Sequence, residues 1–105
     1  MIQEVSPDEV QKAIMENNGT IVLDVRTVEE YGRGHLKSSI NLPVDQLMEK
    51  VEKLLPDKSN TIYVYCLSGS RSEVATEAMS QMGYTKVFNM AGGVLVWRLK
   101  RFPME

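Results

Sequence analysis

Residues 61–72 have the sequence Thr61-Ile62-Tyr63-Val64-Tyr65-Cys66-Leu67-Ser68-Gly69-Ser70-Arg71-Ser72, which contains the only cysteine of the chain. The first five residues are β-branched or aromatic, which is typical of a buried strand in a parallel sheet. After the cysteine, apolar residues recur with a helical period until Gly83. These are Val74, Ala75, Ala78, Met79 and Met82. Cys66 is therefore expected at the C-terminal end of a strand, in a short loop that leads into a helix.

The loop from Cys66 to Ser72 has the features of an anion-binding cradle. Backbone N–H groups at a helix N-terminus lack partners within the helix, and together with the helix dipole they favour a negative charge. Both effects should lower the pKa of the Cys66 thiol, and Arg71 can pair with the thiolate or with an anionic substrate. Gly69 permits the positive φ that a tight loop needs. We therefore interpret Cys66 as a nucleophile whose charge is held by the amides from Leu67 to Arg71.

The three serines of the loop have two predicted roles. Ser70 and Glu73 have the spacing of a capping box, so Ser70 is the predicted N-cap of the helix. Ser68 and Ser72 are better placed to donate hydrogen bonds to a sulfur atom. A phosphate site built from all three hydroxyls is less favoured, because hydroxyls beside a helix start more often cap it.

A lone cysteine is more often a small buried hydrophobic residue than a nucleophile. Here the cysteine lies between a strand and a capped helix, in a loop that also holds Gly69 and Arg71. This combination favours the functional interpretation of Cys66.

The rest of the chain alternates apolar runs with amphipathic segments. Strands are predicted over residues 2–5, 21–25, 39–42, 61–65 and 86–90. Helices are predicted after residues 6, 27, 43 and 70 and over residues 94–101. This alternation predicts an α/β fold with a mostly parallel five-stranded sheet and helices on both faces.

Composition limits the classes of function. The 105 residues are 43% hydrophobic and 25% charged, which suits one globular domain, expected over residues 1–105. The formal net charge of −2 gives no overall attraction to nucleic acid or to anionic membranes. The N-terminal residues lack both the basic region and the long apolar region of a signal peptide. No apolar run is long enough to span a membrane. A single cysteine forms no internal disulfide and a nucleophilic thiol needs a reducing compartment, so we expect a cytoplasmic protein.

The chain resembles the single-domain rhodaneses, a family of thiosulfate or persulfide sulfurtransferases, over nearly its whole length. The pattern Cys-x-x-Gly-x-Arg-Ser is matched by Cys66, Gly69, Arg71 and Ser72. Other family segments follow in their usual order: Leu23-Asp24-Val25-Arg26, Glu30-Tyr31, Gly34-His35-Leu36, Ile40-Asn41-Leu42-Pro43, Gly83-Tyr84, and Gly92-Gly93 followed by Trp97. Lys37-Ser38-Ser39 departs from the family, which often has a Gly-Ala pair there, and this affects only the local turn.

The length of the loop distinguishes between the activities that this resemblance implies. Cell-cycle tyrosine phosphatases and arsenate reductases share the fold and have one more residue between the cysteine and the arginine. Here four residues separate Cys66 from Arg71, which resembles the sulfurtransferase loop sized for a sulfur atom. The resemblance thus implies an enzyme of the thiosulfate:cyanide sulfurtransferase class. The alternatives are a small phosphatase or arsenate reductase, and a rhodanese-like interaction module without catalysis.

The same resemblance implies the reactants. Cys66 would take a sulfur atom from thiosulfate or from a persulfide donor and carry it as a persulfide. A thiol, cyanide or a protein thiol would then accept the sulfur. The substrate cradle would consist of Leu67, Ser68, Gly69, Ser70, Arg71 and Ser72. Neither a metal nor an organic cofactor is expected, and neither nucleic acid nor a membrane is an expected partner.

Asp24 and Arg26 lie at the C-terminal end of the predicted strand 21–25, at the same edge of the sheet as Cys66. The favoured interpretation is structural: Asp24 caps backbone amides and Arg26 pairs with Glu29 or Glu30. By resemblance to the family, Asp24 lies near the active loop and supports it.

Three further side chains are interpreted as structural. His35 is the only histidine, which leaves no multi-histidine metal site and one possible Cys–His dyad. In the family that the chain resembles, this histidine has a structural role. Trp97 and Tyr31 are expected in the core or in a pocket wall, because large aromatic side chains mostly bury area.

Overall fold

The computed structural model describes residues 2–105 and contains one five-stranded sheet with the strand order β1-β5-β4-β2-β3. All pairings in it are parallel. The strands are β1 (Glu4–Val5), β2 (Ile21–Asp24), β3 (Ile40–Asn41), β4 (Thr61–Tyr65) and β5 (Lys86–Met90). The helices are α1 (Pro7–Glu16), α2 (Val28–Gly32), α3 (Leu47–Leu54), α4 (Ser70–Gln81) and α5 (Gly93–Leu99), with a 3₁₀ turn, η1 (Val44–Gln46), before α3. The predicted α/β class and five-stranded parallel sheet are confirmed.

The most apolar strand lies in the middle of the sheet. β4 pairs with β2 on one side and with β5 on the other, from Ile21↔Ile62 to Asp24↔Tyr65 and from Thr61↔Lys86 to Val64↔Asn89. Ile62, Val64 and Tyr65 are almost completely buried, because a parallel sheet is covered on both faces. The edge strands β1 and β3 have only two residues each. This order puts the end of β4, and so Cys66, at the centre of the sheet's carboxyl edge.

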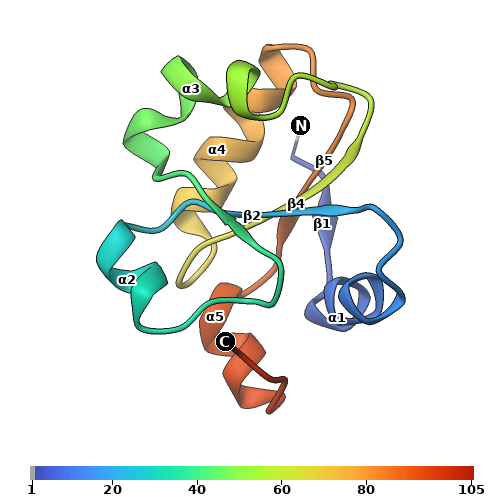
Figure 1. Ribbon diagram of the computed structural model, residues 1–105, viewed down its shortest axis with the longest axis vertical. Helices are drawn as coiled ribbons and strands as arrows, with labels where there is room; N and C mark the ends of the chain where they lie inside the picture. The colour runs from blue at the N-terminus through green and yellow to red at the C-terminus, as the bar shows by residue number, and fades with distance from the viewer. Residues whose placement is uncertain (1) are drawn as a thin grey trace.

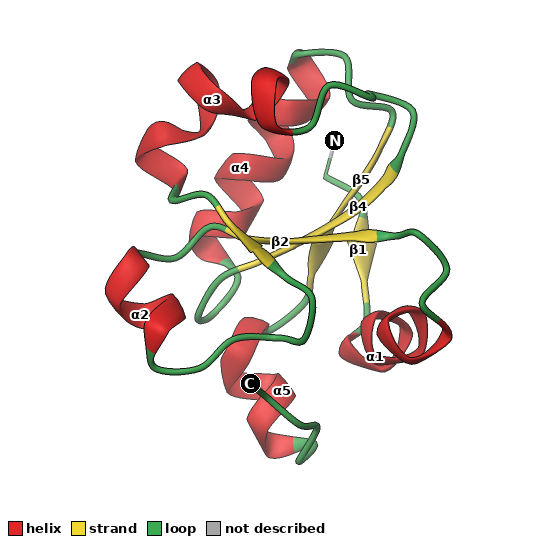
Figure 2. Cartoon of the chain, in the orientation of Figure 1, coloured by secondary structure: helices red, strands yellow, loops and turns green. Residues whose placement is uncertain are grey.

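Helices cover both faces of the sheet, as the sequence predicts (Figure 1). One core lies between the sheet and helices α3 and α4; its helical residues include Leu47, Val51, Ala75 and Met79. The other core lies between the opposite face and helices α1 and α5 and contains Val10, Val94 and Trp97. Trp97 is fully buried, as expected. Figure 2 shows α2 apart from these layers, beside the loop that follows β4.

Two predicted helix starts are formed by their side chains. The Ser6 hydroxyl accepts a hydrogen bond from the Glu9 N–H at 3.1 Å, and Pro7 takes the first position of α1. At α2 a complete capping box joins Thr27 and Glu30. Glu30 is therefore held in place at the start of α2.

No helix among residues 2–105 is long and apolar enough to cross a membrane.

Candidate active site

The loop after β4 is attached to the start of α5 by backbone hydrogen bonds. The Val94 N–H donates to the carbonyl oxygen of Cys66 at 3.0 Å, and the Leu95 N–H donates to that of Leu67 at 3.1 Å. Gly93, which opens α5, has φ +59° and packs directly against these carbonyls. The loop is thus held from behind by α5 and continues forward into α4. Its shape depends on two helices and not on its own residues alone.

The sulfur of Cys66 accepts several hydrogen bonds from its own loop. Gly69 N–H donates to Sγ at 3.1 Å and Ser72 N–H donates to it at 3.4 Å, while the Ser72 hydroxyl oxygen lies within hydrogen-bond distance of Sγ, also at 3.4 Å. Burial of Cys66 raises the pKa of the thiol, but the hydrogen bonds from Ser72, Gly69 and the Ser68 N–H outweigh it, so this pKa is lower than usual. The side chain is also fully buried. The arrangement favours a thiolate in a dry, donor-lined pocket.

The loop glycine and the serines lie as follows. Gly69 has φ +111°, the positive value that the sequence predicts, and it is the N-cap of α4. The prediction that Ser70 caps this helix is wrong: Ser70 is its first residue, and no side chain caps it. The Cys66 sulfur takes the place of a cap, because it accepts the N–H of Ser72 in the first turn of the helix. Ser68 is exposed and contributes its N–H, whereas Ser72 also contributes its hydroxyl.

Asp24 and Arg26 form a buried pair with each other. The Arg26 N–H donates to Asp24 Oδ1 at 2.8 Å, which confirms that Asp24 caps a backbone amide. The predicted pairing of Arg26 with Glu29 or Glu30 is wrong. Its guanidinium instead donates to Asp24 Oδ2 at 2.8 Å and to the Gly34 carbonyl at 2.6 Å. A buried guanidinium is destabilising unless a buried carboxylate pairs with it. The exposed end of α2 provides no buried carboxylate.

Arg71 pairs with Glu30, which the sequence interpretation did not assign to it. The two guanidinium nitrogens of Arg71 donate to the two Glu30 oxygens at 2.7 and 3.0 Å. Hydrogen bonding to Arg71, opposed by burial, lowers the pKa of Glu30 to about 2. No local pattern could reveal a pair 41 residues apart. The positive charge of Arg71 beside the Cys66 loop is therefore partly neutralised by the carboxylate of Glu30.

The Glu30–Arg71 pair predicts a specific dependence of stability on pH. The pKa of Glu30 falls from 4.5 to about 2 on folding, so its stabilisation is fully present above pH 4.5 and is lost as the pH falls towards 2. The pair is partly exposed, so we expect Glu30→Gln to lower the free energy of unfolding by about 1 kcal/mol above pH 4.5, with the difference vanishing near pH 2. Gln keeps the capping oxygen, so only the charge is lost. Denaturant unfolding across this pH range measures it.

Glu29→Gln is the matched control, because it removes the same charge from the adjacent residue of α2, which is exposed. The ion-pair account fails if both variants show the same pH-dependent loss.

Two residues of the site were missed in the sequence. Asn89 lies on β5, is 1% exposed, and its side chain oxygen lies 2.5 Å from the Ser72 hydroxyl. Gly93 approaches the loop backbone more closely than any side chain would permit. The Gly92-Gly93 pair stands in the sequence only as a segment that matches the family, and an asparagine in a strand has no local feature that assigns it to a site.

His35 and Tyr31 support each other away from the sulfur. The His35 Nδ1 atom lies 3.0 Å from the Tyr31 carbonyl oxygen, and the two rings stack with centroids 3.9 Å apart. The Tyr31 hydroxyl donates to the Ser39 carbonyl at 2.6 Å. These contacts fix the connection between α2 and β3. Among the described residues, no cluster of three or more His, Cys, Asp and Glu side chains could hold a metal.

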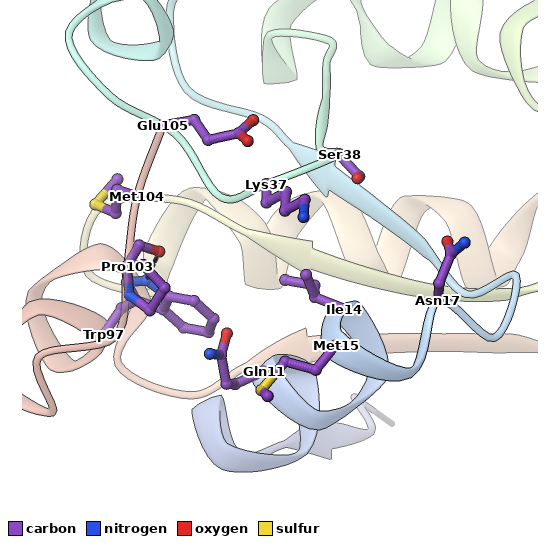
Figure 3. Close-up of a pocket in the computed structure, with 10 residues that line it drawn as sticks. All are labelled: Gln11, Ile14, Met15, Asn17, Lys37, Ser38, Trp97, Pro103, Met104 and Glu105. Atoms are coloured by element: carbon purple, nitrogen blue, oxygen red, sulfur yellow. Dashed lines mark hydrogen bonds between the residues drawn. The ribbon is translucent and has the colours of Figure 1, made fainter.

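A cavity of about 600 Å³ lies away from the Cys66 loop (Figure 3). It is bounded by α1, by Lys37 and Ser38, and by the C-terminal residues 103–105, with Trp97 in its wall. None of the sequence-predicted site residues lines it. The cradle around the sulfur is instead a feature of the loop itself.

Comparison with known proteins identifies the family. A family model described as Rhodanese-like domain matches residues 6–100. The thiosulfate sulfurtransferase PspE of Escherichia coli strain K12 is 41% identical over 70 residues, which cover 67% of this chain and 67% of that protein. The putative sulfur carrier protein YrkF of Bacillus subtilis strain 168 is 30% identical over 91% of this chain, which spans about half (51%) of YrkF.

Solved structures agree with this match. The crystal structure of a rhodanese-related protein from Thermoplasma volcanium superposes with a TM-score of 0.86 at 30% identity, over 98% of this chain and 97% of that one. A thiosulfate sulfurtransferase from Pseudomonas aeruginosa gives a TM-score of 0.90 at 25% identity over 99% of this chain, which corresponds to 20% of that protein. With the sulfur-centred loop at the carboxyl edge of a parallel sheet, these matches show that the chain belongs to the rhodanese-like domain family.

Proposed function

We propose that this chain is a rhodanese-type sulfurtransferase in which Cys66 carries the transferred sulfur. The observation that carries the proposal is the set of hydrogen bonds from Gly69 and Ser72 to Cys66 Sγ, which favours a nucleophilic thiolate. Relatives named as sulfurtransferases support the class of activity. We further propose that residues 1–105 form a single rhodanese-like domain that works in a reducing compartment such as the cytoplasm.

The proposed reaction has two half-reactions. The Cys66 thiolate attacks the outer sulfur of thiosulfate; a new S–S bond to Cys66 forms as the S–S bond of thiosulfate breaks, and sulfite leaves with the electron pair. A persulfide donor would react in the same way and release a thiolate. Cyanide or a thiolate, including that of a protein, then attacks the outer sulfur of the Cys66 persulfide. The bond between the two sulfurs breaks, and the electron pair returns to Cys66 as thiolate.

The loop would stabilise both charged forms of Cys66. Preorganised N–H groups replace the water that a buried thiolate or persulfide loses, without reorganising during the reaction. Leu67 and Ser68 are exposed, whereas Cys66 is buried beneath the loop. We propose that the donor sulfur reaches Cys66 when residues 67–70 shift outward. No step requires a metal or an organic cofactor.

Arg71 is proposed to attract the anionic donor by exchanging part of its pairing with Glu30 for the donor. Arg71→Ala is expected to lower kcat/KM for thiosulfate about tenfold, because one charge-assisted contact is lost. Its effect with an uncharged sulfane-sulfur donor, such as an organic trisulfide, should be smaller. Steady-state rates with the two donors measure the ratio.

Arg33→Ala is the control, since it removes an exposed positive charge at the end of α2. If Arg71→Ala has the same kcat/KM for thiosulfate as the wild type, Arg71 has no role in donor binding.

The experiment that tests the function is an intact-mass measurement. Reduced protein is incubated with thiosulfate, separated from the excess and weighed. We expect a gain of one sulfur atom, which cyanide reverses with release of thiocyanate. If neither thiosulfate nor a persulfide donor adds sulfur, the proposal fails. Hydrolysis of an aryl phosphate would then favour the phosphatase or arsenate reductase alternative, and its absence a non-catalytic interaction module.

A further inference from the structure

Behind Cys66, Ser72 and Asn89 form a buried polar pair, of which the proposed reaction uses only Ser72. Ser72 is fully buried and Asn89 is 1% exposed. The Ser72 hydroxyl oxygen lies 3.4 Å from Cys66 Sγ, 3.1 Å from the Gly69 carbonyl oxygen and 2.5 Å from Asn89 Oδ1. Asn89 lies on β5, where it pairs with Val64 of β4. Tertiary structure therefore supplies Ser72 with a third partner.

The Ser72 hydroxyl has one proton and three neighbouring acceptors, so it can serve only one of them fully. When the oxygen of the Asn89 carboxamide faces Ser72, the proton points to Asn89. The lone pairs of Ser72 then remain for Cys66, which suits an S–H group that donates. When the carboxamide turns by half a rotation, its NH₂ group donates to Ser72, and the Ser72 proton is free to point at the sulfur. That direction suits a thiolate or a persulfide anion.

We propose that Asn89 is a positioning residue that acts through Ser72: the orientation of its carboxamide decides whether the Ser72 proton points to Asn89 or to the Cys66 sulfur. In the thiol state the hydrogen bonds run from Cys66 to Ser72 to Asn89, and in the thiolate state they run in the reverse direction. The thiol proton is released to water, and Asn89 gains and loses none. The inference rests on the proposed function in one respect: the direction of these hydrogen bonds affects catalysis only because Cys66 is the proposed nucleophile.

The other groups that influence the charge at Cys66 stay unchanged in the test. The charged residues around the loop are Arg71 at the start of α4, Glu30 on α2, Asp24 at the end of β2 and Arg26 just after it. Asn89 and Ser72 carry no charge. A change in the titration of Cys66 caused by substitution at residue 89 therefore reports hydrogen-bond direction and not a lost ion pair.

Thr76 provides a matched control in the same buried region. It lies one turn after Ser72 on α4, is 1% exposed, and its hydroxyl has no hydrogen-bond partner among residues 2–105. Thr76→Val removes a buried polar atom of α4 without touching Ser72 or Cys66. A general effect of lost polarity would appear in this variant as well.

The test is a titration of Cys66 by the ultraviolet absorbance of its thiolate in wild type, Asn89→Leu, Ser72→Ala, the double variant and Thr76→Val. The Cys66→Ser spectrum is subtracted to remove tyrosine ionisation. In Asn89→Leu no NH₂ group donates to the Ser72 oxygen and directs the Ser72 proton to the thiolate, so the Gly69 carbonyl competes for this proton and we expect the pKa of Cys66 to rise by about one unit. The double variant should match Ser72→Ala, because Asn89 acts only through Ser72. Thr76→Val should leave the pKa of Cys66 unchanged.

Three results would overturn the inference: an unshifted Asn89→Leu, additive shifts in the double variant, or an equal shift in Thr76→Val. If Asn89→Leu does not fold, Asn89→Ala also removes the carboxamide, without overpacking and without adding a charge. It should raise the pKa of Cys66 by a similar amount, and no rise would overturn the inference. This titration needs no substrate, so its outcome is independent of whether thiosulfate loads the wild-type protein with sulfur.

Discussion

Cys66→Ser is expected to lose sulfur transfer almost completely, by on the order of 10⁴-fold or more. The chain has one cysteine, so no second thiol can replace it. A serine alkoxide is far less accessible near neutral pH, and an oxygen cannot hold a transferable sulfur as a persulfide does. The rate of thiocyanate formation from thiosulfate and cyanide measures the loss, together with the absence of the added sulfur mass.

The same variant should remain folded, and this separates chemistry from structure. Serine is close in shape to cysteine and can accept the N–H groups of Gly69 and Ser72 that reach Sγ. We therefore expect a thermal transition close to that of wild type. Transfer activity in a homogeneous, folded Cys66→Ser preparation would show that the persulfide mechanism is wrong.

Gly93→Ala is expected to disrupt both the fold and the site. A Cβ atom at residue 93 would lie 2.5 Å from the Leu67 carbonyl oxygen and 2.6 Å from that of Cys66, while φ is +59°. Because both contacts are backbone atoms of the active loop, no flexible side chain can move aside. The left-handed conformation and the overpacking together should lower the free energy of unfolding by about 3 kcal/mol or more. Denaturant unfolding measures this, and the pKa of Cys66 should rise as the loop shifts.

Gly19→Ala separates the two causes. Gly19 also has a positive φ, +86°, but nothing lies within 4 Å of a Cβ placed there. Its substitution should cost only about 1–2 kcal/mol, the strain of the backbone conformation, and leave sulfur transfer unchanged. If Gly93→Ala were no worse than Gly19→Ala, the close approach of α5 to the loop would have no energetic importance.

The elements of the fold could be predicted because their signals are local. The apolar run of β4, the helical spacing of α4 and the capping residues Ser6 and Thr27 each depend on neighbours within a few positions. Errors occurred where two local signals competed. At the start of α4 the Ser70–Glu73 spacing predicts a cap at Ser70, but Gly69 is the N-cap: the Glu73 N–H donates to the Gly69 carbonyl oxygen, and the Ser72 N–H donates to the Cys66 sulfur.

Charge partners could not be predicted in this way. For Arg26 the sequence offered Glu29 and Glu30, and for Arg71 it offered only the thiolate or an anionic substrate. Asp24 is buried beside Arg26, whereas Glu30 is held by its capping box at a distance that suits Arg71. Which carboxylate is desolvated, and therefore binds which guanidinium, depends on how α2 packs over the edge of the sheet.

The sequence by itself determined the class of fold, the position of Cys66 between a strand and a helix, and the four-residue spacing to Arg71, because strand, loop and helix are encoded by adjacent residues. Only the tertiary structure decided that Glu30 shares the charge of Arg71, that Gly93 supports the loop, and that Asn89 reaches Ser72. Asn89 and Ser72 are 17 residues apart and meet because β5 lies beside β4 under α4. Such contacts follow from strand order and packing, which no local pattern of residues contains.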